Sequence, residues 1–263
     1  MPIFTDQMDR QISIPERPER IVSLVPSQTE LLADLGLDDE VAGITKFCVH
    51  PEKWFRSKQR IGGTKQLHLD RIADLDPDLI IGNKEENDRE QIEALMGKYP
   101  VWMSDIRRLP DALNMIRSIG AITGREAEAL DLAGRIGEAF ARLDFPEFNR
   151  MKVAYLIWRS PFMAAAADTF IDEMLTLAGF DNAFKNRSRY PEIIGTDLQD
   201  AAPDAVFLSS EPYPFREKHF EEIRDHCPGT SILLVDGEYF SWYGSRLLGA
   251  PAYFNGIRKK LER

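Results

Sequence analysis

Short apolar runs alternate with amphipathic stretches over roughly the first 120 residues of the chain. RIVSLVPS (20–27) and VAGIT (41–45) are continuous and rich in β-branched residues, so they predict buried strands. Ser27 and Glu30 have the spacing of a capping box, which predicts a short helix ending at Gly36. The pattern continues with predicted helices at 69–75, 88–97 and 110–121 and predicted strands at 78–82 and 101–105.

A long helical pattern divides the chain into two halves. Thr123 and Glu126 form a second predicted capping box, and helical periodicity then continues until Pro146. Beyond Pro146 the alternation of strands and helices begins again. It predicts strands at 152–159, 205–210 and 231–237 and helices at 169–178, 214–226 and 250–262.

The two halves share a sequence phrase. LDRIADLDPDLIIGNKEE and TDLQDAAPDAVFLSSEP each run through helix, Pro-Asp, strand and acidic loop. Alternating strands and helices are typical of parallel sheets covered by helices. We therefore predict an α/β protein with two Rossmann-like lobes, each built on a parallel-type central sheet and joined by one long α-helix. The predicted parts are an N-terminal lobe (1–122), a linking helix (123–146) and a C-terminal lobe (147–263).

The predicted strand-end loops are rich in aromatic residues. Ligands of open α/β sheets bind beyond the carboxyl ends of the strands, so two facing lobes would form a cleft walled by these loops. Aromatic rings offer a planar ligand a large contact area. The loops include Phe47, Trp54, Trp158, Tyr190 and the run EYFSWYGSR at 238–246.

Composition and motifs exclude several classes of function. The 43 acidic residues outnumber the 33 basic ones and give a net charge of -10, which is unsuited to binding nucleic acid. No stretch approaches the roughly 20 apolar residues of a membrane span. There is no G-x-S-x-G elbow, phosphate-binding loop or G-x-G-x-x-G motif after the first strand, so the sequence predicts no enzyme. We expect a monomer with no intrinsic cofactor.

The order and spacing of several segments resemble one known family. These segments are RIVSLVPSQTELLADLGL, GITKFCVHP, LHLDRIADLDPDLIIG, the linking helix, LIWRSPFMAAAADTF, and YPEI followed by APDAVFL. Nearly the whole chain resembles the helical-backbone substrate-binding proteins of ABC importers, which include vitamin B12, haem and ferric-siderophore receptors. The B12-binding branch is the most similar. The resemblance implies a non-catalytic protein that binds a corrinoid, or a related metal chelate such as haem or a ferric siderophore.

The resemblance also implies particular ligand residues. Aromatic positions of the B12-type cleft fall on Phe47 and Tyr190, and an apolar position falls on Phe162 or Met163. Thr64 and Asn83 stand where B12 receptors have tryptophans, so rings from the C-terminal lobe would replace that stacking surface. The predicted ligand residues are Phe47, Cys48, His50, Asn83, Lys84, Trp158, Arg159, Phe162, Met163, Tyr190, Tyr239, Trp242, Tyr243 and Arg246.

Three of these groups have plain alternatives. EYFSWYGSR could be a packed surface loop, since aromatic residues often close the end of a sheet. Trp158 could cap the core while Arg159 is solvated. The acidic loop that begins with Lys84 could be a solvated charged loop.

Cys48 and His50, in FCVHPEKWF (47–55), allow three interpretations. They could be half of a metal-ion site, although zinc needs further ligands such as Glu52 or His68. Cys48 could instead pack as a small apolar group while His50 makes a polar contact. The resemblance adds a third, in which one of them is an axial ligand to a metal inside a macrocycle. We favour a ligand wall without a metal bond.

The two cysteines, Cys48 and Cys227, form no C-x-x-C pair, although one disulfide between them stays open. The resemblance further implies docking to an ABC permease through one acidic residue on each lobe. Asp70 occupies the first position, and its alternative role is favourable interaction with the helix dipole. Thr196 replaces the second acid, so we assign that role to the adjacent Asp197, with Glu192 also close.

The first residues of the sequence and the family that it resembles predict different cellular compartments. MPIFTDQMDRQISIPERPER is polar and acidic where an export signal needs an apolar run, and MPIFTDQMDR predicts an edge hairpin. We therefore expect either a signal-less cytoplasmic protein or a sequence trimmed of its leader, although the family is periplasmic.

Overall fold

The computed structural model describes residues 1–145 and 150–262, which form two compact units. Helix α6 begins in the first unit and ends in the second. The four-residue segment Tyr243–Arg246 belongs to the first unit, although it lies late in the chain. The first unit comprises Met1–Ile106, Pro110–Gly137 and Tyr243–Arg246, and the second comprises Arg107–Leu109, Glu138–Trp242 and the chain from Leu247 onward. The predicted lobe boundaries at 122 and 146 stay predictions.

A five-stranded parallel sheet forms the centre of the first unit, in the order β5-β4-β3-β8-β9. Its central strands are apolar on both faces and fully buried, as expected for a parallel sheet with helices on each side. The four predicted strands are confirmed with shifts of at most four residues at their ends, and the edge strand β5 was not predicted. The strands are β3 (Ile21–Ser23), β4 (Val41–Ile44), β5 (Gln59–Arg60), β8 (Leu79–Asn83) and β9 (Val101–Ser104).

The predicted helices of this half are found in order, with α2 in addition, but both predicted capping boxes are wrong. Pro26 takes the first position of α1, where its missing N–H costs nothing, and Val25 is the N-cap without a side-chain bond. Thr123 ends α5, and its Oγ1 donates to the carbonyl of Ile119 at 2.6 Å. The helices are α1 (Pro26–Asp34), α2 (Glu52–Ser57), α3 (Leu69–Leu75), α4 (Arg89–Met96), α5 (Leu109–Thr123) and α6 (Glu126–Ala141).

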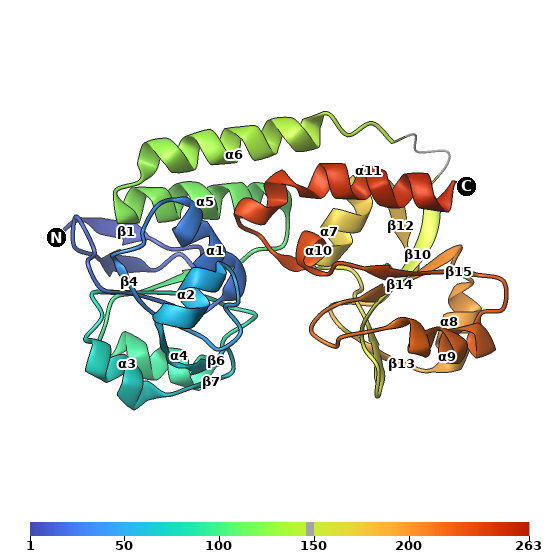
Figure 1. The fold of residues 1–263 in the computed structure, drawn as a ribbon, viewed down its shortest axis with the longest axis horizontal. Coiled ribbons are helices and arrows are strands. Elements are labelled where there is room, and N and C mark those ends of the chain that lie inside the picture. Colours follow the sequence, from blue (N-terminus) through green and yellow to red (C-terminus); the bar gives the residue numbers. More distant parts are fainter. Residues whose placement is uncertain (146–149, 263) are drawn as a thin grey trace. The chain divides into compact units, whose positions relative to one another are not determined.

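Helices α5 and α6 pack side by side (Figure 1). A Cβ added at Gly120 of α5 would lie 2.2 Å from the Cβ of Ala129 in α6. Only glycine therefore permits this close approach of the two helices.

The predicted edge hairpin is confirmed. Strands β1 (Ile3–Thr5) and β2 (Gln11–Ser13) pair antiparallel, and their turn contacts the edge strand β9. There the Gln7 N–H donates to the Met103 carbonyl at 3.1 Å, and Asp6 accepts from the Met103 N–H at 3.3 Å. A second small hairpin pairs β6 (Gly62–Gly63) with β7 (Gln66–Leu67).

The sheet of the second unit is mixed rather than wholly parallel. Its order is β13-β11-β10-β14-β15, and β12 also pairs with β10. Strands β14 and β15 follow the predicted parallel pattern, and β12, which was not predicted, also pairs parallel with β10. Strand β11 runs antiparallel to both of its neighbours, β10 and β13, because the chain turns back after Trp158. The strands are β10 (Met151–Trp158), β11 (Phe162–Ala164), β12 (Phe180–Asn182), β13 (Glu192–Ile193), β14 (Ala205–Ser209) and β15 (Ser231–Val235).

Buried aromatic residues fill the core of the second unit. Tyr155, Phe207 and Phe240 contact one another with ring centroids 5.2 to 6.5 Å apart. Phe240 lies in α10, so the predicted loop EYFSWYGSR in fact begins as a helix. The helices are α7 (Phe170–Leu177), α8 (Gly195–Ala201), α9 (Phe220–His226), α10 (Glu238–Ser241) and α11 (Ala250–Leu261), with 3-10 turns η2 (Glu217–His219) and η3 (Ser245–Leu248).

The shared sequence phrase corresponds to a repeated structure. Helices α3 and α8 each end in a left-handed residue, Asp76 (φ 43°) and Ala202 (φ 42°). In the first unit Asp78 accepts hydrogen bonds from the backbone N–H groups of Glu19 and Arg20, both at 2.9 Å. In the second unit Asp204 accepts from the N–H of Lys152 at 2.7 Å. In each unit one aspartate thus connects the start of its own strand to the start of the neighbouring strand in the sheet.

Within the described ranges, no helix has the length and apolar character needed to cross a membrane.

Candidate functional site

An exposed aromatic ring lies just beyond β4 in the first unit. The side chain of Phe47 is 52% exposed, and the Nζ of Lys46 lies 5.0 Å from its ring centroid. The ring also approaches Gly63, where an added Cβ would lie 3.1 Å from Phe47 Cε2. The ring is thus supported from the protein side and presents apolar surface to solvent at the carboxyl end of the sheet.

Cys48, next in the chain, points into the protein. It is completely buried, and its Sγ lies 3.1 Å from the hydroxyls of both Thr29 and Thr45. Burial raises the pKa of the thiol. His50 is half-buried, and residues 1–145 and 150–262 contain no cluster of three His, Cys, Asp or Glu suited to a metal. This environment matches the interpretation of Cys48 as a packed apolar group.

Trp54 does not belong to the strand-end surface, which corrects its assignment to an aromatic loop. It lies in α2, only 1% exposed, and its indole N–H donates to Asp38 at 2.7 Å.

Asn83 and Lys84 lie at the carboxyl end of β8 and have different roles. Asn83 is buried, and its amide accepts from the backbone N–H groups of Glu85 and Glu86 and donates to Ser104 Oγ at 2.9 Å. The exposed Lys84 pairs with Asp105 at 2.5 Å. Asn83 therefore shapes the loop, whereas Lys84 lies on its surface.

Tyr243 and Arg246 are held by carboxylates of the first unit. The Tyr243 hydroxyl donates to Glu86, and the Arg246 guanidinium forms two hydrogen bonds with Glu30 of α1. Ser245, between them, donates to Asp34 of the same helix. These contacts make the segment Tyr243–Arg246 a structural part of the first unit.

The second unit has an exposed aromatic residue at the end of its central strand β10. Trp158 is 40% exposed and packs edge to face on Tyr213, with ring centroids 5.7 Å apart. The adjacent Arg159 is exposed, and its Nε donates to Glu222 at 2.8 Å. Hydrogen bonds with Glu222 and Tyr213 raise the pKa of Arg159. The sequence prediction missed Tyr213, whose signal is an aromatic residue between two prolines just after a buried strand.

The other predicted residues of the second unit are spread over several environments. Phe162 is buried in the core, and Met163 beside it is half-buried in β11. Tyr190 is half-buried, with the Arg189 guanidinium 5.5 Å from its ring centroid. Phe162 is therefore less accessible to a ligand than Met163.

Tyr239 and Trp242 pack against neighbouring groups. Tyr239 stacks on Tyr253 with ring centroids 4.5 Å apart. The buried Trp242 donates its indole N–H to Glu211 at 2.9 Å, and Ser241 donates to the same oxygen at 2.6 Å. Burial of Glu211 raises the pKa of its carboxyl group. Trp242 thus supports the loop after β14.

The two predicted docking acids occupy the first turns of the equivalent helices α3 and α8. Asp70 is exposed at the second position of α3. Asp197 is engaged, because it pairs with Arg187 and accepts from the Ile194 N–H at 2.9 Å. The Arg187 hydrogen bond, followed by that from Ile194, lowers the pKa of Asp197. In the repeat, Thr196 takes the position of Asp70.

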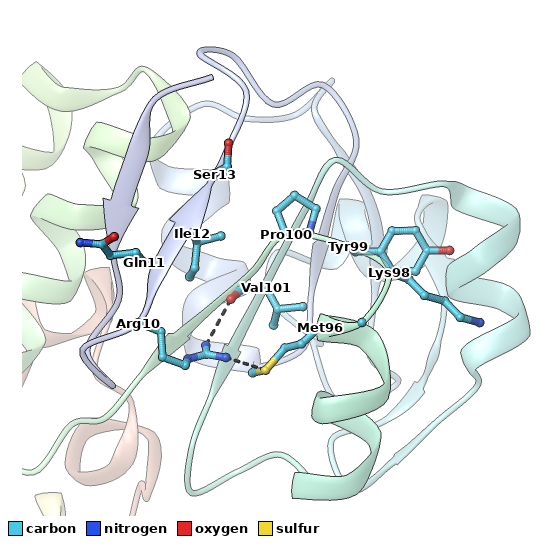
Figure 2. Close-up of a pocket in the computed structure, with 10 residues that line it drawn as sticks. Arg10, Gln11, Ile12, Ser13, Met96, Lys98, Tyr99, Pro100 and Val101 are labelled. Atoms are coloured by element: carbon cyan, nitrogen blue, oxygen red, sulfur yellow. Dashed lines mark hydrogen bonds between the residues drawn. The ribbon is translucent and has the colours of Figure 1, made fainter.

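A polar cavity of about 430 Å³ lies away from these residues, at the start of β9 in the first unit. Figure 2 shows Arg10 from the hairpin reaching the Val101 carbonyl, at 3.2 Å, beside Met96. None of the predicted ligand residues lines this cavity. It lies at the amino end of its strand, where open α/β sheets do not usually bind ligands.

Comparisons with known proteins bear on the whole chain. The sequence profile of the family described as periplasmic binding protein matches residues 21–228. The vitamin B12-binding protein of Pectobacterium carotovorum subsp. carotovorum (strain PC1) is 21% identical over 238 residues, which cover 88% of this chain and 85% of that protein.

Solved structures share the fold. The periplasmic vitamin B12 binding protein BtuF of Vibrio cholerae is 19% identical with a TM-score of 0.76, and the match covers 95% of this chain and all of that one (100%). The periplasmic heme-binding protein RhuT from Roseiflexus sp. RS-1 is 21% identical with a TM-score of 0.77, and the match covers 93% of this chain and 99% of that one.

Proposed function

Because the chain belongs to the periplasmic binding protein family, we propose that it binds a corrinoid or a closely related metal chelate and presents it to an ABC importer. The family consists of substrate-binding proteins of ABC transporters, so the chain is not an enzyme. The observation that carries the choice of ligand is the exposure of Phe47 (52%) and Trp158 (40%) at the strand ends of their units. Exposed flat rings suit a flat, largely apolar macrocycle.

The likeness to vitamin B12-binding proteins supports a corrinoid as the first candidate. Haem or a ferric siderophore is the second, because a haem-binding protein has the same fold. A bare metal-ion site on Cys48 and His50 has less support, since the Cys48 thiol is enclosed and engaged by two threonine hydroxyls. Elemental analysis of the purified protein tests that alternative.

Absorbance tests the ligand class directly. The protein is mixed separately with cyanocobalamin, cobinamide, haemin and a ferric siderophore, and each mixture is passed through a gel-filtration column. We expect the protein peak to retain a chromophore, cyanocobalamin or cobinamide first. Retention of haemin or the siderophore alone would favour the second candidate, and retention of none would contradict the proposal.

Replacing one exposed ring separates specific from non-specific retention. We expect Phe47→Ala to weaken binding of the retained chelate by about fivefold, because a ring contact contributes on the order of 1 kcal/mol. Leu130→Ala is the matched control, because Leu130 is an equally exposed apolar residue (50%) on α6, away from the strand ends. Equal affinities of the two variants would remove Phe47 from the site.

We further propose that Asp70 contacts the permease. Its exposed carboxylate in the first turn of α3 suits an arginine of the transporter. Asp70→Ala should reduce stimulation of ATP hydrolysis by the importer in proteoliposomes, while Asp74→Ala in the same helix should not. Asp197 is the weaker candidate of the second unit, since Arg187 already neutralises it.

The compartment stays a prediction. The family is described as periplasmic. The codons upstream of Met1 test export: an in-frame apolar leader or lipoprotein cysteine there would support it, and its absence would favour the cytoplasmic expectation.

A further inference from the structure

Resting on the proposed function, we propose that Trp158, Arg159 and Tyr213 form a polar subsite of the second unit for a hydrogen-bond acceptor on the ligand. Trp158 supplies an exposed ring face, and the Tyr213 hydroxyl donates to an amide carbonyl or carboxylate oxygen at the ligand's edge. His219 is the positioning residue that fixes the direction of this donation.

Tyr213 is held from several sides. Its backbone N–H donates to the Ile157 carbonyl at 3.3 Å, which ties the loop after β14 to the end of β10. Its ring contacts Trp158, Phe215 and His219, with centroids 5.7, 4.8 and 5.6 Å away. A side chain fixed in this way loses little conformational entropy when a ligand binds.

The hydrogen bonds of His219 determine its tautomer. The backbone N–H of Arg216 donates to His219 Nδ1 at 2.9 Å, so Nδ1 carries no proton and Nε2 carries one. Burial, followed by the positive charge of Arg159, lowers the pKa of His219 and favours this neutral form. The Nε2–H therefore donates to the Tyr213 hydroxyl oxygen, 3.4 Å away.

Arg159 interacts with Tyr213 and carries a positive charge. A guanidinium has only donors, so it cannot accept the proton of Tyr213. His219 Nε2 already carries a proton, so it cannot accept that proton either. An acceptor on the ligand can therefore take that proton, and the exposed ring of Trp158 lies beside the Tyr213 ring.

The proposed subsite favours ligands that carry a hydrogen-bond acceptor at their edge. Corrinoids carry peripheral amide carbonyls and haem carries carboxylates, so both offer an acceptor beside a flat apolar ring system. The positive charge of Arg159, itself paired with Glu222, favours the carboxylate further. A chelate without a peripheral acceptor would gain only the Trp158 contact.

The test titrates cyanocobalamin and haemin into the wild type, Tyr213→Phe and Tyr99→Phe. Tyr213→Phe keeps the ring and removes the hydroxyl, so we expect a three- to tenfold loss of affinity for whichever chelate the wild type binds. Tyr99→Phe makes the same change just before β9, in the first unit, and should leave affinity unchanged. Circular dichroism and the unfolding midpoint establish that each variant is folded.

His219→Gln tests the positioning role. In the wild-type background it should weaken binding, and in the Tyr213→Phe background it should have no further effect, because the hydroxyl it orients is gone. A purely structural role would give the same loss in both backgrounds and would overturn this part.

Two failures are distinguishable. If the wild type binds neither cyanocobalamin nor haemin, the corrinoid and haem forms of the proposed function fail, and this subsite fails with them. If the wild type binds one of them and Tyr213→Phe binds it equally well, the subsite alone is overturned.

Discussion

Glu211 is a carboxylate surrounded by donors and by other acids. Its side chain accepts from Ser241 and Trp242, while Glu238 and Asp236 lie close enough to repel its charge. Desolvation outweighs the hydrogen bonds, and the pKa of Glu211 rises above its ordinary value of 4.5. The native state therefore binds a proton at pH values where the unfolded chain has released it.

That shift predicts how stability depends on pH. Because the native state binds more protons than the unfolded state above about pH 4.5, the free energy of unfolding falls as pH rises through this range. Glu211→Gln keeps an acceptor oxygen and removes the titration. Urea unfolding should show that the free energy of unfolding falls less between pH 4.5 and pH 7 for this variant than for the wild type. Glu128→Gln, at an exposed position of α6, should behave as the wild type.

Which site residues could be predicted from the sequence depends on what surrounds each one. Strand ends are visible in the apolar pattern, so Phe47 and Trp158 were placed correctly beyond β4 and at the end of β10. The partners of Arg246 and Tyr243 lie 216 and 157 residues away, and no local pattern indicates such contacts. Tyr213 was missed for the same reason, since its orientation depends on His219 and Ile157.

Gly120 and Gly134 lie in adjacent helices, but Gly120 is crowded by its neighbours and Gly134 is not. A Cβ at Gly120 would lie 2.2 Å from Ala129 Cβ and 2.8 Å from the Arg125 carbonyl, whereas nothing lies within 4 Å of one at Gly134. Gly120→Ala should therefore lower the free energy of unfolding by about 1 to 3 kcal/mol, through overpacking. Gly134→Ala should raise it by about 0.5 to 1 kcal/mol, through helix propensity.

Urea unfolding of both variants measures these effects. If both substitutions changed the free energy of unfolding in the same direction, that result would contradict the packing of α5 on α6.

Elements were easier to predict than their ends. The apolar periods located α3 at Leu69–Leu75 and α11 at Ala250–Leu261. Both capping-box predictions were wrong because neither Ser27 nor Thr123 is an N-cap. Pro26 already starts α1, so Ser27 lies inside that helix, and the Thr123 hydroxyl donates to the Ile119 carbonyl within α5. Strands β11 and β13 were missed because each has only two or three residues, too few to show a strand period.

Asp78 and Asp204 occupy equivalent positions in the two units. Asp78 accepts two backbone N–H groups and Asp204 accepts one, each at the start of a central strand. We expect Asp78→Ala to cost about 1 to 2 kcal/mol of unfolding free energy and Asp204→Ala about 0.5 to 1 kcal/mol. Chemical denaturation measures both, with Asp74→Ala as the control.

No effect from either substitution would mean that the sequence phrase is repeated without a shared structural role.

The segment Tyr243–Arg246 has a consequence for how the protein is made. Its bonds to Glu30, Asp34 and Glu86 join residues 216, 211 and 157 positions apart. During synthesis from the amino terminus, the first unit emerges from the ribosome early but lacks these contacts until nearly the whole chain has been translated.

A ribosome-bound chain arrested before residue 243 should expose α1 to protease, and one arrested after the chain has fully emerged should protect it. The half that is translated first is therefore among the last to become resistant to degradation.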